Sequence, residues 1–366
     1  MADLRRPGLG VLVLGAAVGG LALAFRPERL NGGEARDRVK RVRAIAPSQE
    51  GGRGRAASSP WRIPWKGWKD ILWRTYQEIQ RDRLLAVAAG VVFFGLLAFF
   101  PTVTAFVSLY GLFVEPGTIR EHLDLAASVM PAGAVDILRE QVERIVSKPS
   151  GTLGFAFIVS LGLALWSSNS GMKAVIDALN VAYEEDEKRS FIRLNLISLA
   201  FTIGGLIALL LALSAVVIFP LVLAAIGLNS WVSTIIWLVR WPILLVFVIL
   251  GLAVLYRYGP SRREPKWEWV TPGSLFAATA WIGGSLLLSW YLQNFADYNA
   301  TYGSLGAAIG FMMWLWVSSI VILLGAELNS EIEHQTARDS TRGPVEKPLG
   351  ARGATMADTI GKAQFA

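Results

Sequence analysis

Arg240 lies within the apolar stretch STIIWLVRWPILLVF, roughly 10–13 Å along a helix from its start. A guanidinium there can hold an anionic group or pair with an acid, and burying it in a bilayer costs about 2.5–3.5 kcal/mol on insertion scales. Three interpretations stay open. They are a side chain that snorkels between Trp237 and Trp241, a structural ion pair for which Asp297 is the first candidate, and a contact to a substrate.

A second polar group lies in LWSSNSGMKAVIDALNVAYEEDEKRSF, residues 165–191. Asn169 ends an apolar run, and Lys173 and Asp177 are four residues apart, so they share one face of a helix. This face either lines a vestibule or belongs to a helix that simply leaves the bilayer. The last apolar run ends GAELNSEIE, which places Glu327 about one turn inside the predicted boundary.

The third group is ADYNATYGSLGAAIG, residues 296–310. Gly303, Gly306 and Gly310 recur at helical spacing, and small residues let helices approach closely in lipid. Tyr302 suits an aromatic belt, and Asn299 can satisfy the backbone of a tight turn. We expect helix packing and an outer turn here, with an outer gate that faces a ligand as the alternative.

Acid–base and metal chemistry find little support. The chain has no Cys, and its two His residues, His122 and His334, are far apart in sequence. The motifs H-E-x-x-H and G-x-S-x-G and a Walker-type phosphate loop are absent. The sequence therefore predicts no catalytic residue, no metal site and no cofactor.

The elements that must position these residues are apolar runs. Hydrophobic residues make up 53% of the 366 residues and charged residues 17%, against about 25% in soluble domains. A membrane-spanning helix needs about 20 apolar residues. We expect an all-α fold, a polytopic transmembrane helical bundle with six core spans plus an N-terminal anchor helix. The core spans are expected at 84–114, 152–170, 194–225, 233–257, 270–292 and 303–327.

The net charge of +7 is unevenly distributed among the loops. Residues 26–83 hold 15 Lys and Arg, and the loops 171–193 and 257–269 hold four each, whereas 226–232 and 293–302 hold none. Basic loops stay cytoplasmic. We therefore expect a multi-pass protein of the bacterial inner membrane with a cytoplasmic C-terminus. Its expected partner is the lipid bilayer, including anionic lipids, and not nucleic acid.

The regions outside the spans divide as follows. We expect a membrane anchor at 1–28, with a cleaved signal peptide as the alternative, and a disordered basic cytoplasmic linker at 29–60. The six-span domain is expected at 61–335. It includes an outer amphipathic loop at 115–151, and a disordered cytoplasmic tail follows at 336–366.

Residues 65–83 are expected to form an amphipathic helix at the membrane surface. Trp68, Ile71, Leu72, Tyr76 and Ile79 fall at helical spacing, and Trp is typical of the headgroup layer. Basic side chains, including that of Arg74, are expected on the opposite, polar side.

Residues 165–191, LYRYGP at 255–260 and NFADYNATYGSLGAAIGFMMWLWVSSIVILLGAELNSEIE at 294–333 resemble the YihY/virulence factor BrkB family of bacterial inner-membrane proteins. The resemblance covers about 65–335 and implies six core helices with both ends cytoplasmic. Phe93-Phe94-Gly95 stands where the family commonly has Tyr and Ser. Some members carry the label ribonuclease BN. Two His cannot build the metal cage that such hydrolysis needs.

Two functions of different kinds follow. The first is transport, or handling of a lipid or another amphiphile, across the membrane, which the intramembrane Arg and the polar groups at both ends of the core favour. The alternative is a membrane scaffold without catalysis, whose basic linker recruits anionic lipid or partners.

Overall fold

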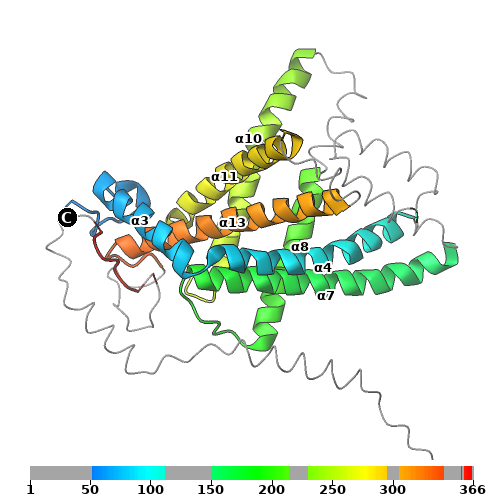
Figure 1. Cartoon of the computed structure of the whole chain (residues 1–366), viewed down its shortest axis with the longest axis horizontal. Helices are drawn as coiled ribbons and strands as arrows, with labels where there is room; N and C mark the ends of the chain where they lie inside the picture. The colour runs from blue at the N-terminus through cyan, green and yellow to red at the C-terminus, as the bar shows by residue number, and fades with distance from the viewer. Residues whose placement is uncertain are drawn as a thin grey trace, which may run out of the picture. The chain divides into compact units, whose positions relative to one another are not determined.

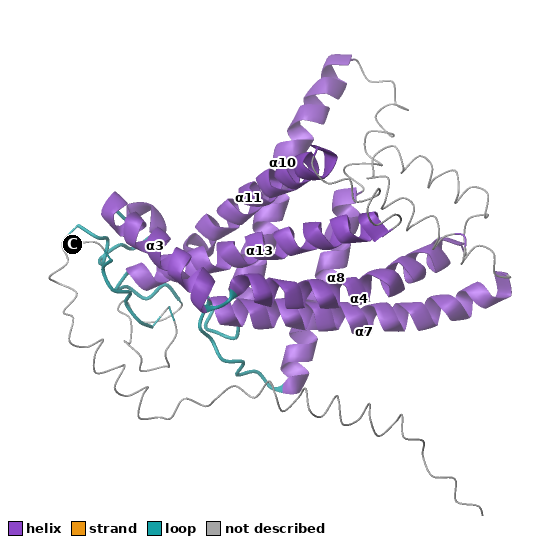
Figure 2. Ribbon diagram, in the orientation of Figure 1, coloured by secondary structure: helices purple, strands orange, loops and turns teal. Residues whose placement is uncertain are grey.

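The computed structural model describes residues 52–111, 143, 150–213, 230–294, 305–341, 356 and 358–364, all within the compact unit Pro47–Ala366. These residues form helices and loops without a strand, as Figures 1 and 2 show, and the predicted all-α class is confirmed. The elements are η2 (Pro60–Arg62), α3 (Trp65–Arg81), α4 (Leu84–Gly111), α7 (Ser150–Ala182), α8 (Phe191–Leu213), α10 (Ser230–Tyr258), α11 (Trp267–Asn294) and α13 (Leu305–Gln335).

Four helical stretches in the described part of the chain are long and apolar enough to cross a membrane. They are Phe191–Leu209, Leu238–Tyr258, Trp267–Leu292 and Ala308–Gln335, and the bent pair α3–α4 makes up to five if it counts as one span. The chain is thus a multi-pass membrane protein. Each of the six predicted core ranges overlaps one helix. The full count of six spans stays a prediction, and the anchor at 1–28 lies outside the described residues.

The bend between α3 and α4 has a local cause. The two helices meet at 61°, and Arg83 between them adopts a φ of 50°. This left-handed conformation is unfavourable for a residue with a Cβ, and it cannot continue a right-handed helix. The long apolar helix α4 can therefore leave the direction of the more polar α3.

The helices pack as two pairs that α13 joins. Helix α4 runs along α7, and α11 runs along α13, while α13 also contacts α3, α4 and α7. Helix α8 packs on α7, and α10 packs on α11. The core where the pairs meet consists largely of small and aliphatic residues, such as Ala88, Ala178, Ala277 and Ala326, which let helices approach closely in lipid.

Helices α11 and α13 approach closely at two glycines. A Cβ on Gly273 would lie 2.1 Å from the carbonyl oxygen of Gly325, and one on Gly325 would lie 2.7 Å from the carbonyl oxygen of Gly273. Asn329 fastens this contact, because its side chain accepts from the Gly273 amide at 2.7 Å and donates to the Val270 carbonyl at 3.1 Å.

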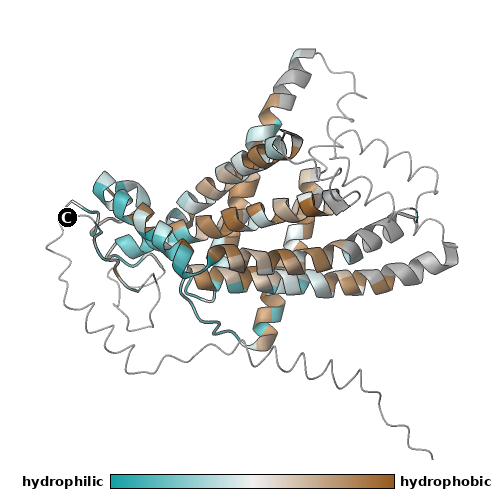
Figure 3. Cartoon of the chain, viewed as in Figure 1, coloured by the Kyte–Doolittle hydropathy of each residue, from teal (hydrophilic) through white to brown (hydrophobic). Residues whose placement is uncertain are grey.

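Hydrophilic residues concentrate where α3 and the end of α13 meet (Figure 3). We use "charged end" for α3, the connections 183–190 and 259–266, and the last turns of α13. The buried face of α3 includes Gly67, Ile71 and Arg74. Arg74, expected on the polar side of a surface helix, is instead buried and forms an ion pair with Glu331 of α13.

The aromatic face of α3 points away from the protein. Trp65, Leu72, Trp73 and Tyr76 are exposed. The expectation that this helix lies at the membrane surface stays a prediction, as does the loop 115–151, which lies almost wholly outside the described residues.

The described parts of the expected linker and tail contact the charged end. Arg55 donates to the carbonyl oxygens of Gln335 at 3.0 Å and Gly361 at 2.6 Å. The amide of Gln364 donates to Asp70 of α3, which also pairs with Arg53 at 2.7 Å. Both ends of the described chain therefore take part in packing α3 against α13.

Candidate functional site

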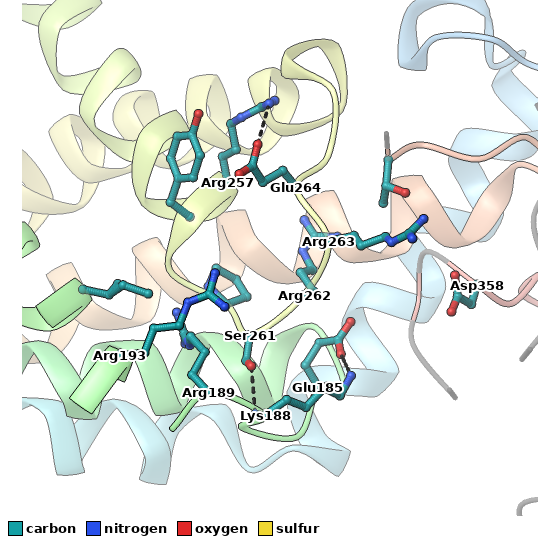
Figure 4. Close-up of a pocket in the computed structure, with 14 residues that line it drawn as sticks. Glu185, Lys188, Arg189, Arg193, Arg257, Ser261, Arg262, Arg263, Glu264 and Asp358 are labelled. Carbon is teal, nitrogen blue, oxygen red and sulfur yellow. Dashed lines mark hydrogen bonds and ion pairs between the residues drawn. The ribbon is translucent and has the colours of Figure 1, made fainter. Parts of the chain in front are cut away.

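A cavity of about 690 Å³ lies at the charged end, between the connection from α7 to α8 and the connection from α10 to α11 (Figure 4). Its cationic lining side chains outnumber the acidic ones six to three. The cations are Lys188, Arg189, Arg193, Arg257, Arg262 and Arg263, and the acids are Glu185, Glu264 and Asp358. We call this cavity the cationic pocket.

The two connections that form its walls are tied together by hydrogen bonds. Asn180, in the last turn of α7, accepts from the Ser261 amide at 2.7 Å and donates to Glu187 at 3.1 Å. The amide of Lys188 donates to the hydroxyl of Ser261 at 2.9 Å. Helix α7 ends at Ala182, before Glu187 and Lys188, because Glu184 adopts a φ of 49° and cannot continue a right-handed helix. The walls are thus held by side chains at fixed positions.

Arg189 and Glu187 stiffen the same connection. Two nitrogens of Arg189 each lie 2.7 Å from Glu187, and one of them also donates to the Gly259 carbonyl at 2.9 Å. Burial opposes a charge on Glu187. Hydrogen bonds from Arg189 and Asn180 nevertheless lower its pKa to about 2. Glu187 is therefore an anion that fixes Arg189.

Arg262 anchors the pocket to α13. Its guanidinium donates two hydrogen bonds of 2.9 Å to Glu333, and both side chains are almost fully buried. It also lies 3.9 Å from the ring centroid of Tyr183, a cation–π contact. Burial alone would lower the pKa of Arg262, but the charge of Glu333 raises it above its ordinary value.

Arg257 is held in a comparable way near the other side of the pocket. It donates to the Pro265 carbonyl and, at 3.3 Å, to Glu264. Its guanidinium lies 4.6 Å from the ring centroid of Trp267. Since Lys188 also pairs with Glu185 at 2.8 Å, four of the six cations have acidic partners. These pairs fix the walls of the pocket, and Arg193 and Arg263 leave it with a positive charge that can attract an anion.

The predicted polar group of α7 lies against the start of α8. Asn169 accepts from Ser198 at 2.5 Å and donates to Asn195 at 3.3 Å. Lys173 lies 5.6 Å from the ring centroid of Phe191, while Asp177 is exposed. Whether this face lines a vestibule stays a prediction.

Arg240 lies in α10, partly buried and 5.0 Å from the ring centroid of Trp241. Glu327 is 1% exposed, and its Oε2 has no hydrogen-bond partner in the described part of the chain. The predicted pair of Arg240 with Asp297 stays untested because Asp297 lies outside the described residues.

The predicted outer turn is largely outside the described residues as well, which leaves Asn299, Tyr302 and Gly303 without a structural account. Gly306 and Gly310 belong to α13. A Cβ on Gly310 would make an ordinary 3.6 Å contact with Leu292. The tight contact of α11 with α13 is instead at Gly273 and Gly325.

None of the predicted site residues lines the cationic pocket. The sequence contains a signal for this pocket, because the charge rule places the basic loops 171–193 and 257–269 on the same side of the membrane. The charge rule by itself indicates topology and not a binding site. Among the described residues, no group of three or more His, Cys, Asp or Glu is placed to hold a metal ion.

The model of the family described as virulence factor BrkB matches residues 75–349. The chain belongs to this family. It is 32% identical over 248 residues to the putative ribonuclease-like protein YfkH of Bacillus subtilis. This alignment covers 66% of the present chain and 88% of YfkH. The UPF0761 membrane protein NMB0524 of Neisseria meningitidis serogroup B is 25% identical over 280 residues, 74% of this chain and 65% of that protein.

A UPF0761 membrane protein of Alkalilimnicola ehrlichii is 27% identical over 275 residues, 73% of this chain and 59% of its own length. The matches thus span less than two thirds of these two UPF0761 proteins. No solved structure matches the chain. The resemblance to the YihY/BrkB family noted from the sequence is confirmed.

Proposed function

We propose that this BrkB-family membrane protein handles anionic lipids or related amphiphiles and moves them across the membrane. The observation that carries the proposal is the cationic pocket at the charged end. Basic pockets between membrane helices are typical binding sites for anionic head groups. A head group has both the charge and the size for a cavity of about 690 Å³.

The pocket also has apolar lining, as an amphiphile requires. Ile197, Tyr258 and Pro260 line it beside the cations. Ile197 belongs to α8 and Tyr258 ends α10, and both helices contain stretches able to cross a membrane. An amphiphile could therefore keep its chains beside these helices while its head group lies among the arginines.

The proposal includes an orientation. The pocket is formed by the two basic loops, 171–193 and 257–269, so the charge rule favours a cytoplasmic pocket in the inner membrane of a bacterium. The proposal also gives Arg240 a role: its charge contacts the anionic head group within the apolar part of α10.

The test is a lipid-movement assay in proteoliposomes. Labelled phosphatidylglycerol and equally labelled phosphatidylcholine are followed between leaflets, with protein-free vesicles as the baseline. We expect faster movement of phosphatidylglycerol with protein, and slower movement with Arg240→Ala than with Arg62→Ala, an exposed arginine of η2 that does not line the pocket. If the protein moves neither lipid, the proposal fails and the scaffold alternative gains.

The proposal assigns the protein no nucleic-acid substrate. The name of the Bacillus subtilis relative contains the words ribonuclease-like, so RNA cleavage is the rival to be tested. Purified protein and its Arg263→Gln variant, which changes the pocket without breaking an ion pair among the described residues, are incubated with labelled transfer RNA. Cleavage that co-purifies with the wild-type protein and disappears in the variant would contradict the proposal.

A further inference from the structure

The six cations of the cationic pocket fall into two groups. Lys188, Arg189, Arg257 and Arg262 are held by acidic side chains, as described above. The guanidinium groups of Arg193 and Arg263 form no hydrogen bond or ion pair with any residue that the structure describes. These two arginines are therefore the ones available to a ligand.

Arg193 differs from Arg263 in its surroundings. It is the third residue of α8, whose stretch Phe191–Leu209 is able to cross a membrane. Its neighbours Phe191, Ile192 and Leu196 are 78%, 71% and 63% exposed. Exposed apolar side chains at this density on a membrane helix are expected to face lipid. Arg193 is thus a cation that lines the pocket, has no partner among the described residues and lies beside exposed apolar side chains.

Arg263 lies in the connection from α10 to α11, a polar segment between two helices. Figure 4 shows Arg193 and Arg263 on opposite sides of Ser261, with Arg263 toward Asp358. The two guanidinium groups are therefore not arranged as one clamp. Arg263 carries the same charge in the same pocket without the apolar neighbours, which makes it a matched control.

We propose that Arg193 binds the phosphate of an anionic phospholipid that enters the cationic pocket sideways from the adjoining membrane leaflet. The acyl chains lie along the exposed face of α8, and the head group extends past Ile197 and Tyr258 toward the paired arginines. An arginine binds phosphate through two parallel charge-assisted hydrogen bonds. The α8 N-terminus adds the positive end of the helix dipole. This inference deepens the proposed function and rests on it for its biological meaning.

A lipid fits this site better than a soluble phosphate. A free phosphate would gain nothing from Phe191, Ile192 and Leu196, whereas a phospholipid buries its chains on them. Entry from the membrane also fits the position of Arg193. Of the two pocket arginines without a partner among the described residues, it is the one at the end of a span, where a lipid phosphate lies.

The experiment measures lipid binding to purified full-length protein by native mass spectrometry, titrating phosphatidylglycerol and, separately, phosphatidylcholine. We expect tighter binding of phosphatidylglycerol to the wild type. Arg193→Gln weakens it about tenfold, which corresponds to about 1.4 kcal/mol. Arg263→Gln changes it less than about twofold. Equal weakening by both variants would show a diffuse electrostatic effect and overturn the proposal.

Two further arms separate the sources of phosphate and remove dependence on one variant. Inorganic phosphate at millimolar concentration should leave phosphatidylglycerol bound, and displacement by it would identify a soluble-anion site instead. Photoactivatable phosphatidylglycerol in vesicles should crosslink the wild-type peptide that contains residues 191–197. Crosslinks confined to other helices would overturn lateral entry.

These measurements are independent of lipid movement. Binding that depends on Arg193 in a protein that moves no lipid would refute the proposed function and leave the site intact. Movement of lipid that is indifferent to Arg193→Gln, with unchanged binding, would refute the site alone.

Discussion

Breaking the buried ion pair of Arg262 and Glu333 should cost more stability than breaking any exposed pair at the charged end. Replacing Arg262 with Met keeps much of the side-chain volume and removes the charge. Glu333 then stays buried without its guanidinium, and Tyr183 loses the cation at 3.9 Å. We expect Arg262→Met to lower the free energy of unfolding substantially.

The magnitude follows from the surroundings of Glu333. Removing one partner of a buried ion pair typically costs 3–5 kcal/mol. The hydroxyl of Ser340 still donates to Glu333 at 2.6 Å, which places the expected loss near the lower end, about 3 kcal/mol. In the double variant Arg262→Met/Glu333→Leu neither charge of this pair is left buried. The loss should shrink toward zero, because replacing a buried ion pair by apolar side chains of similar volume is often neutral.

The assay is reversible unfolding of the detergent-solubilised protein by a denaturing detergent, followed by tryptophan fluorescence and circular dichroism. The control is Lys188→Met, which breaks the pair with Glu185 where Lys188 is 53% exposed. An exposed pair contributes about 0–1 kcal/mol. The reasoning is refuted if Arg262→Met costs no more than Lys188→Met, or if the double variant is no more stable than the single one.

Three further outcomes are expected. Gly273→Ala should destabilise the protein by about 1–3 kcal/mol through overpacking against α13, measured in the same unfolding assay, while Gly283→Ala on the same helix, where a Cβ meets nothing within 4 Å, should be close to neutral. The pKa of Glu187 is lowered from 4.5 to about 2. The contribution of ionised Glu187 to the free energy of unfolding is therefore complete above about pH 4.5 and is lost as the pH falls toward 2. Glu187→Gln should flatten the curve of stability against pH in that window and leave its slope above pH 5 unchanged. Arg83→Gly should stabilise the bend between α3 and α4 by up to about 1 kcal/mol because glycine adopts a φ of 50° without strain, and a thermal midpoint below that of the wild type would contradict this.

The helices could be predicted because each is a long apolar run, and the length needed to cross a membrane is a strong constraint. All six predicted core ranges overlap helices of the structure. The ends of the spans stay predictions. Helix α7 continues past the predicted span 152–170 to Ala182, as the shared helical face of Lys173 and Asp177 indicated, and its last turns are buried against the core by Ile176 and Leu179. Hydropathy alone does not register a polar turn that packs on protein.

The interpretation of α3 shows the limit of sequence periodicity. The spacing of its aromatic residues indicated which side is apolar, and we took the other side, with Arg74, to be solvated. The structure buries Arg74 because Glu331, 257 residues away in sequence, supplies the opposite charge. A periodic pattern describes a helix by itself and contains no information about a distant partner.

The same reasoning explains why the cationic pocket was missed. Arg262 in a short basic loop has the sequence features of a solvated, topology-setting residue. Its burial depends on Glu333, 71 residues later, and on Tyr183 at the end of α7. The role of Arg262 can be recognised only when its own loop, the end of α13 and the end of α7 are seen to pack together. The charge rule places both basic loops on one side of the membrane, where they can come together. The sequence can predict this shared side, but not the contacts that form the pocket.

The paired and the available arginines of the pocket are physically connected. Arg262 can line a cavity and remain rigid only because its charge is satisfied by Glu333 on α13, which also contacts α3 and α4. A pocket built wholly from cations without partners would repel itself and collapse onto any nearby acid. The ion pairs of four of the six cations fix the walls of the pocket. Arg193 is not in such a pair among the described residues, so a ligand can bind it without first breaking an ion pair. Breaking an ion pair would lower the affinity. The position of Arg193 at the lipid-facing start of α8 then decides from which side an anion arrives.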